Sequence, residues 1–145
     1  MKPFPNREAA GRELAARLRE YALPDPIVLA LPRGGVEVGF EIARILNAPL
    51  DIVPARKLGA PVQPELAFGA IAPGASIVNQ RIVRELGLSS HEIAEVIAEE
   101  EREMNRRGSI FRSGRPPLDV RQRTAIIVDD GLATGATAVA AIRSA

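Results

Sequence analysis

The chain has 145 residues, with 19 basic and 18 acidic residues and a formal net charge of +1. This length suits a single domain with a core of adequate size, and the balanced charge with only 3% aromatic residues leaves neither an electrostatic nor a stacking basis for binding nucleic acid. The absence of cysteine excludes disulfides and thiolate metal sites. The sequence also has no apolar run long enough to span a membrane and no signal-peptide core. We therefore expect residues 1–145 to form one cytoplasmic domain without a nucleic-acid or membrane partner.

The first predicted elements are a helix and a strand. Asn6 can cap a helix that runs from about Arg7 to Tyr21. The apolar face of this helix would consist of Ala10, Leu14, Leu18 and Tyr21. The short, continuous apolar run Ile27–Leu31 then predicts a buried strand. A strand of this kind is typical of the parallel sheet of an α/β protein.

A glycine-rich turn follows this strand and is a candidate anion site. It contains Arg33, Gly34 and Gly35, and a helical pattern begins at Val36. Glycine lets the backbone approach a ligand closely, and the arginine side chain has a fork that fits phosphate oxygens. Taken alone, such a segment is weak evidence and is more often an ordinary turn.

The next strand, Leu50–Val53, leads to the basic pair Arg56 and Lys57. At the carboxyl end of this strand the two cations would face the same ligand edge, although a solvated basic pair is an equal alternative. The prolines and glycines that follow predict an irregular or hairpin-like excursion over residues 58–80. Long loops in compact domains are often lids, so this segment is a candidate lid.

A second helix is predicted after this excursion. Ser89 and Glu92 form a capping-box pattern at its start, and Arg106-Arg107 before Gly108 indicates its end. Its charged residues are those of a solvated face, so we assign it a structural role.

The most informative segment begins with the buried strand Thr124–Val128. Two acids, Asp129 and Asp130, stand at its carboxyl end, and a Gly/Thr turn and an alanine-rich helix follow. Open α/β sheets bind ligands at this edge, where helix N-termini favour anions. Carboxylates do not bind phosphate but accept hydrogen bonds from sugar hydroxyls. A diol beside a phosphate describes a ribose 5-phosphate.

Two other phosphate-binding loops are excluded by spacing. A P-loop needs a lysine, and none occurs in Gly131–Thr137. The dinucleotide fingerprint needs glycines at other spacings than those of Gly34, Gly35 and Gly39.

The segment from Val128 to Thr137 closely resembles the phosphoribosyl-pyrophosphate loop of the type I phosphoribosyltransferases. That loop has an apolar run, two acids, two or three variable residues and then Thr-Gly-x-Thr. The resemblance implies that Asp129 and Asp130 hold the ribose hydroxyls. It implies that the 5′-phosphate binds the segment that consists of Ala133, Thr134, Gly135, Ala136 and Thr137. The pyrophosphate site would consist of Arg33, Gly34, Gly35, Arg56 and Lys57, with Lys57 on the leaving group. In such relatives the peptide before the arginine, here Pro32–Arg33, is often cis.

The resemblance also implies the fold and the reaction. The fold would be a three-layer, Rossmann-like parallel sheet of the phosphoribosyltransferase type, with residues 58–80 as a loop or hairpin lid. The reaction would transfer ribose 5-phosphate from phosphoribosyl pyrophosphate to a nitrogenous base, with Lys57, Asp129 and Asp130 as catalytic residues. Mg²⁺ would be held mainly by the ligand, so no dedicated protein metal site is expected. The partners would be these small molecules, and a homodimer is left open.

Two departures from the family concern the base. Ala133 stands where the hypoxanthine-guanine enzymes carry an aspartate, which disfavours 6-oxopurine specificity and leaves the acceptor open. The chain reaches Ala145 one short helix after the loop, so the further strands and base-binding hood of the family are not found. We expect either a fragment of a longer protein or a base site supplied from elsewhere.

Two other functions remain open at this point. The first is a non-catalytic regulatory domain that senses a phosphoribosyl ligand or nucleotide. The second is a structural α/β domain that binds only incidental anions.

Overall fold

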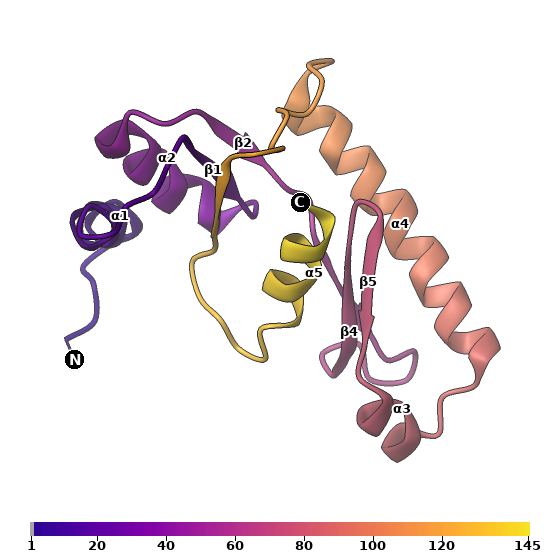
Figure 1. Cartoon of the computed structure of the whole chain (residues 1–145). Helices are drawn as coiled ribbons and strands as arrows, with labels where there is room; N and C mark the ends of the chain where they lie inside the picture. Colours follow the sequence, from indigo (N-terminus) through magenta and orange to yellow (C-terminus); the bar gives the residue numbers. More distant parts are fainter. Residues whose placement is uncertain (1) are drawn as a thin grey trace. The chain divides into compact units, whose positions relative to one another are not determined.

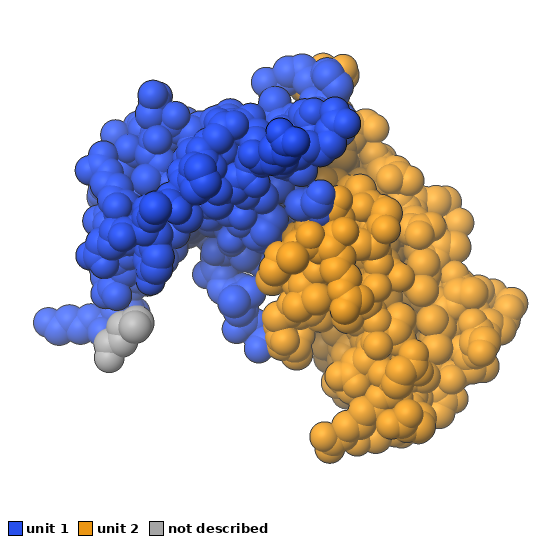
Figure 2. All heavy atoms as spheres, in the orientation of Figure 1, with its two compact units in different colours: residues 1–53, 115–133, 145 blue, residues 54–114, 134–144 orange. Residues whose placement is uncertain are grey.

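The computed structural model describes residues 2–145, which divide into two compact units (Figure 2). Of the described residues, the first unit contains 2–53 and 115–133 together with residue 145, and the second contains 54–114 and 134–144. Each unit has its own sheet (Figure 1), so each is described by itself.

The first unit is built on a parallel sheet with the strand order β2-β1-β6. These strands are β1 (Pro26–Ala30), β2 (Leu50–Ile52) and β6 (Thr124–Val128). The helix α2 (Gly34–Leu46) packs on β1, and the helix α1 (Arg7–Leu18) packs on α2. Four of the five residues of β1 are buried, as expected for a central parallel strand. The predicted α/β class and the three predicted parallel strands are confirmed.

The buried face of α1 differs from the prediction. Asn6 caps the helix by accepting a hydrogen bond from the Ala9 amide, but the helix ends at Leu18 and its buried residues are Gly11 and Ala15. A Cβ atom at Gly11 would lie 2.7 Å from the Glu41 Cβ. Small residues therefore bring the α1 backbone close to α2. The predicted face was wrong at Leu14 and Tyr21, which are 37% and 67% exposed.

The second unit is built on an antiparallel sheet with the strand order β3-β4-β5. These strands are β3 (Arg56–Gly59), β4 (Ala67–Ala72) and β5 (Ala75–Val78). The helices α4 (Ser90–Arg112) and α5 (Ala136–Ser144) both contact β4 and lie on either side of it (Figure 1), and α3 (Gln80–Leu86) also contacts it. Because β4 is central and covered, five of its six residues are buried.

The segment predicted as an excursion therefore contributes to a core. That core consists of Leu58, Phe68, Ile71, Val83 and Met104. The connection between β3 and β4 is exposed throughout residues 61–66, with Val62 at 94%. A lid function for residues 58–80 stays a prediction.

Helix α4 begins as predicted and ends later. Ser89 and Glu92 form both hydrogen bonds of the capping box, but the helix continues past Arg106-Arg107 to Arg112. Gly108 is buried, and a Cβ there would lie 3.3 Å from the ring of Pro54. Packing against Pro54 therefore overrides the local stop signal. Within the described residues, no helix combines the length and apolar character needed to cross a membrane.

Glu103 on α4 allows a test of pH dependence. It accepts hydrogen bonds from Arg106 and Arg107, which lower its pKa from 4.5 to about 2. A depressed pKa in the folded state contributes stability above the ordinary pKa of the group, and this contribution is lost as the pH falls toward 2. We expect Glu103→Gln to lower the urea midpoint slightly at pH 7, with the difference disappearing near pH 2. The control is Glu99→Gln at an exposed position of the same helix, and an equal pH dependence of both variants would contradict the assignment.

Candidate functional site at the carboxyl edge of the parallel sheet

The two predicted loops of the first unit lie side by side because their strands pair. Strands β1 and β6 are parallel, with Ala30 opposite Val128. The pairing continues beyond β1, since the Leu31 amide donates a hydrogen bond of 2.8 Å to the Val128 carbonyl. The turn Arg33–Gly35 follows β1, and Asp129 and Asp130 follow β6. The structure thus brings the predicted pyrophosphate loop and the predicted ribose acids to one edge of the sheet.

Contact between these loops depends on glycine. A Cβ atom at Gly34 would lie 1.9 Å from the Asp130 Oδ2 atom, and one at Gly35 would lie 2.7 Å from the Val128 carbonyl oxygen. Both distances are shorter than any side chain tolerates, so the two glycines allow the turn to lie directly against the acidic loop. The Pro32–Arg33 peptide bond is cis, as the resemblance implied.

The two acids have different partners. The Asp129 Oδ1 atom accepts a hydrogen bond of 2.8 Å from the Asp130 amide. The Asp130 Oδ2 atom accepts hydrogen bonds from Arg7, at 3.2 Å from Nε and 2.8 Å from Nη2. These bonds lower the pKa of Asp130 and raise the pKa of Arg7. Asp130 is therefore ionised at neutral pH and can only accept hydrogen bonds, such as those that a hydroxyl group donates.

Arg7 was missed in the sequence analysis, although the sequence contains one signal for it. Arg7 is the first residue of α1, where the helix dipole disfavours a positive charge. A basic residue at this position therefore indicates an acidic partner elsewhere in the fold. Only the tertiary structure shows that the partner is Asp130.

The predicted phosphate loop divides between the units, with Ala133 in the first and Thr134 to Thr137 in the second. Gly135 has a positive φ of 81° and precedes the first residue of α5. The Thr134 hydroxyl accepts a hydrogen bond from the Ala136 amide at 3.4 Å. The first amides of a helix lack carbonyl partners within the helix and favour anions. The start of α5 therefore has the local structure expected of a phosphate-binding segment.

The basic pair lies elsewhere than predicted. Arg56 and Lys57 belong to β3 of the antiparallel sheet, not to a loop at the carboxyl end of β2. Successive residues of a strand point to opposite faces, and the Arg56 Nε atom lies 2.7 Å from Glu100 Oε2 on α4, whereas Lys57 is exposed. The two cations therefore do not share one environment. Their roles toward pyrophosphate stay predictions, and Arg56 already has a carboxylate partner.

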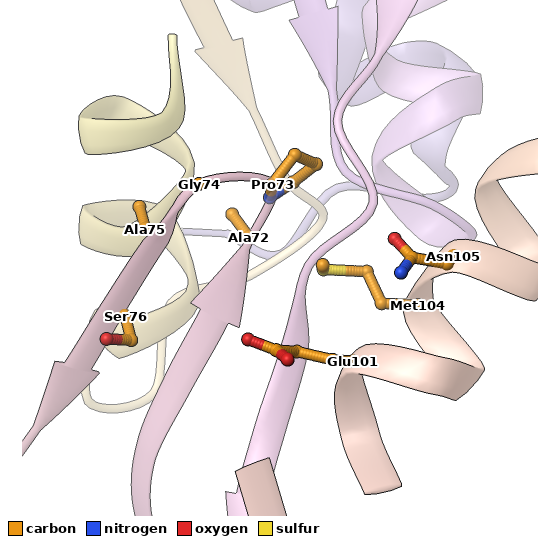
Figure 3. Close-up of a pocket in the computed structure, with 8 residues that line it drawn as sticks. All are labelled: Ala72, Pro73, Gly74, Ala75, Ser76, Glu101, Met104 and Asn105. Carbon is orange, nitrogen blue, oxygen red and sulfur yellow. The ribbon is translucent and has the colours of Figure 1, made fainter. Parts of the chain in front are cut away.

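A pocket in the second unit contains none of the predicted site residues (Figure 3). It has a volume of about 420 Å³ and lies between the β4–β5 turn and α4. Its lining consists of Ala72, Pro73, Gly74, Ala75, Ser76, Glu101, Met104 and Asn105.

Magnesium can be tested against the residues present. Within residues 2–145, no group of three or more histidine, cysteine or acidic side chains is arranged to hold a metal ion. Mg²⁺ commonly keeps several waters and binds substrate phosphates. A magnesium ion held mainly by a bound ligand stays a prediction.

Comparisons with known proteins show the family and the fold of the chain. Two curated proteins from Mycobacterium tuberculosis, strains CDC 1551 / Oshkosh and H37Rv, each provisionally named a phosphoribosyl transferase, are 49% identical over 146 residues, which cover 100% of this chain and 33% of each relative. The chain thus spans about a third of the length of these relatives. The crystal structure of TT1426 from Thermus thermophilus matches with a TM-score of 0.77 and 37% identity, over 97% of this chain and 67% of that one. The family model for the phosphoribosyl transferase domain matches residues 2–144. The chain therefore belongs to the phosphoribosyl transferase domain family.

Proposed function

We propose that the chain binds phosphoribosyl pyrophosphate and transfers ribose 5-phosphate to a nitrogenous base, or catalyses the reverse reaction. The observation that carries this proposal is the contact of the ionised Asp130 with the Arg33–Gly35 turn at the carboxyl edge of the parallel sheet. A diol-binding acid next to an anion-binding turn suits a sugar that carries a diphosphate. Membership of the family supports the same ligand class.

Each part of the ligand has a proposed partner. Asp129 and Asp130 accept hydrogen bonds from the 2′- and 3′-hydroxyls. The 5′-phosphate binds the main-chain amides of residues 133–137 and the hydroxyls of Thr134 and Thr137. The turn Arg33–Gly35 binds the pyrophosphate. Lys57 contacts the leaving group, with Arg56 in a weaker role because Glu100 already neutralises it.

The proposed reaction is a displacement at C1 of the sugar. A nitrogen lone pair of the base forms the new bond to C1, and the bond from C1 to the pyrophosphate oxygen breaks with its electron pair leaving on pyrophosphate. Where the attacking nitrogen carries a hydrogen, that proton is released to solvent. The chain contributes mainly by positioning the ligand and by neutralising charge. Mg²⁺, bound to the diphosphate oxygens, would supply further charge neutralisation to the leaving group.

Ligand-induced stabilisation tests the binding step. Because a ligand that binds only the folded state stabilises it by mass action, phosphoribosyl pyrophosphate with Mg²⁺ at a hundred times Kd should add about 2.7 kcal/mol. The measurement is the melting temperature with phosphoribosyl pyrophosphate, and with ribose 5-phosphate and inorganic pyrophosphate as partial ligands. An unchanged melting temperature of the folded chain at millimolar ligand would contradict the proposal.

Turnover is tested separately. Release of pyrophosphate would be measured with a panel of purine and pyrimidine bases, on this chain and on a longer form that spans its relatives' length. Base-dependent release supports transfer. Binding without release from either form would contradict transfer and leave the sensing role considered above.

A further inference from the structure

The ion pair of Arg7 with Asp130 differs from the other ion pairs of α1. Arg12 pairs with Glu8 and Arg17 with Glu13, each within one turn of the helix. Arg7 instead binds a carboxylate 123 positions away in the sequence. That carboxylate is one of the two acids assigned above to the ribose. The pair therefore joins the first turn of α1 to the proposed binding loop.

The geometry around the pair restricts the Asp130 carboxylate. Arg7 directs both Nε and Nη2 to the Oδ2 atom. The backbone of Gly34 lies against the same oxygen, since a Cβ there would be only 1.9 Å away. Arg7 itself follows the Asn6 cap, and α1 is anchored on α2 through Gly11 and Ala15. The carboxylate is thus held between a helix terminus and the anion-binding turn.

We propose that Arg7 is a positioning residue, which orients the Asp130 carboxylate for a ribose hydroxyl. Both donors of Arg7 go to Oδ2, so neither occupies Oδ1, which is the oxygen that we assign to the hydroxyl. This inference rests on the proposed function, because it gives Arg7 a role only toward a ligand with a ribose. Neither the resemblance nor the comparisons assign a role to Arg7.

The charges around the pair are consistent with this role. The hydrogen bonds from Arg7 are the main cause of the lowered pKa of Asp130, and burial opposes them. The other charged groups that act on the pair are Asp129 in the same loop and Glu37 of α2. Arg7 is the cation among them, so its removal should return Asp130 toward ordinary carboxylate behaviour.

The first measurement needs no ligand. The side-chain carboxyl carbon of Asp130 would be titrated by NMR in the wild type, in Arg7→Gln and in the matched control Arg12→Gln. We expect the apparent pKa of Asp130 to rise in Arg7→Gln and to stay at the wild-type value in Arg12→Gln. Arg7→Lys keeps the charge but not the fork, and its pKa should lie between those of wild type and Arg7→Gln.

The second measurement is binding. Exposed ion pairs are weak, so Arg7→Gln should weaken binding of phosphoribosyl pyrophosphate by only about two- to fivefold. Binding of inorganic pyrophosphate, which has no ribose, should not change. In a double-mutant cycle, Arg7→Gln should have no further effect once Asp130→Asn is present, because both changes remove the same interaction.

The results that would overturn the role of Arg7 can be distinguished from those that would overturn the proposed function. If the wild type binds phosphoribosyl pyrophosphate and Arg7→Gln binds it equally well or more tightly, Arg7 does not position Asp130 and the inference fails alone. Equal losses for both ligands, or additive effects in the cycle, would assign Arg7 a general structural role and also overturn it. Absence of binding by the folded wild type would instead overturn the proposed function, and the inference with it.

Discussion

Replacing Asp130 by asparagine is expected to weaken the binding of phosphoribosyl pyrophosphate at least tenfold while leaving the binding of inorganic phosphate almost unchanged. Asparagine keeps the shape of the side chain but removes its charge. Hydrogen bonds to charged groups contribute about 1.5–3 kcal/mol each, which corresponds to a tenfold or larger change. Asp129→Asn should have an effect of the same kind. Isothermal titration with the two ligands measures both affinities.

The chain offers a matched control for these variants. Asp119 is an exposed aspartate of the first unit whose carboxylate binds Arg121, and it lies outside the proposed site. Asp119→Asn should leave both affinities unchanged. If Asp130→Asn reduced the affinities for both ligands equally, the acid would support the loop without contacting the ribose.

The largest effect on stability is expected for Phe68→Ala. Phe68 lies in β4, is fully buried, and belongs to the core of the second unit. Truncation of a buried phenylalanine removes its transfer free energy and leaves a cavity, which together cost about 3–5 kcal/mol. Because the chain has two units, hydrogen exchange of the β4 and β5 amides in rising urea is the suitable measurement. It reports the opening of this unit specifically.

The control for Phe68→Ala lies in the connection between β3 and β4. Val62 is 94% exposed, so Val62→Ala should leave the exchange of the same amides unchanged. Equal protection in wild type and Phe68→Ala would show that this unit does not depend on the core described above.

Local signals were sufficient for several elements. The continuous apolar runs at β1 and β6 predicted parallel strands, and the two strands pair in parallel. The predicted burial is confirmed for the central strand β1 but was wrong for β6, which lies at the edge of the sheet with only Val128 buried. Asn6 and Ser89 marked helix starts because a cap is an interaction between residues only three positions apart. The spacing of the acids and the Gly/Thr turn after β6 indicated the family, which the family model confirms. These residues are consecutive, so the motif can be read from the local sequence.

Only the tertiary structure decided which residues of these elements are buried and which distant residues they contact. The sequence by itself determined the α/β class, the parallel strands and the acidic loop. It did not determine the Gly11 and Ala15 face of α1, because the close approach of α2 makes small residues the buried ones. Nor did it determine the partner of Arg7 or the contact of Gly34 with Asp130, because these contacts join segments far apart in the chain. Such contacts depend on the pairing of β1 with β6, which places both loops at one edge of the sheet. This pairing joins distant segments, so it cannot be predicted from the spacing of neighbouring residues in the sequence.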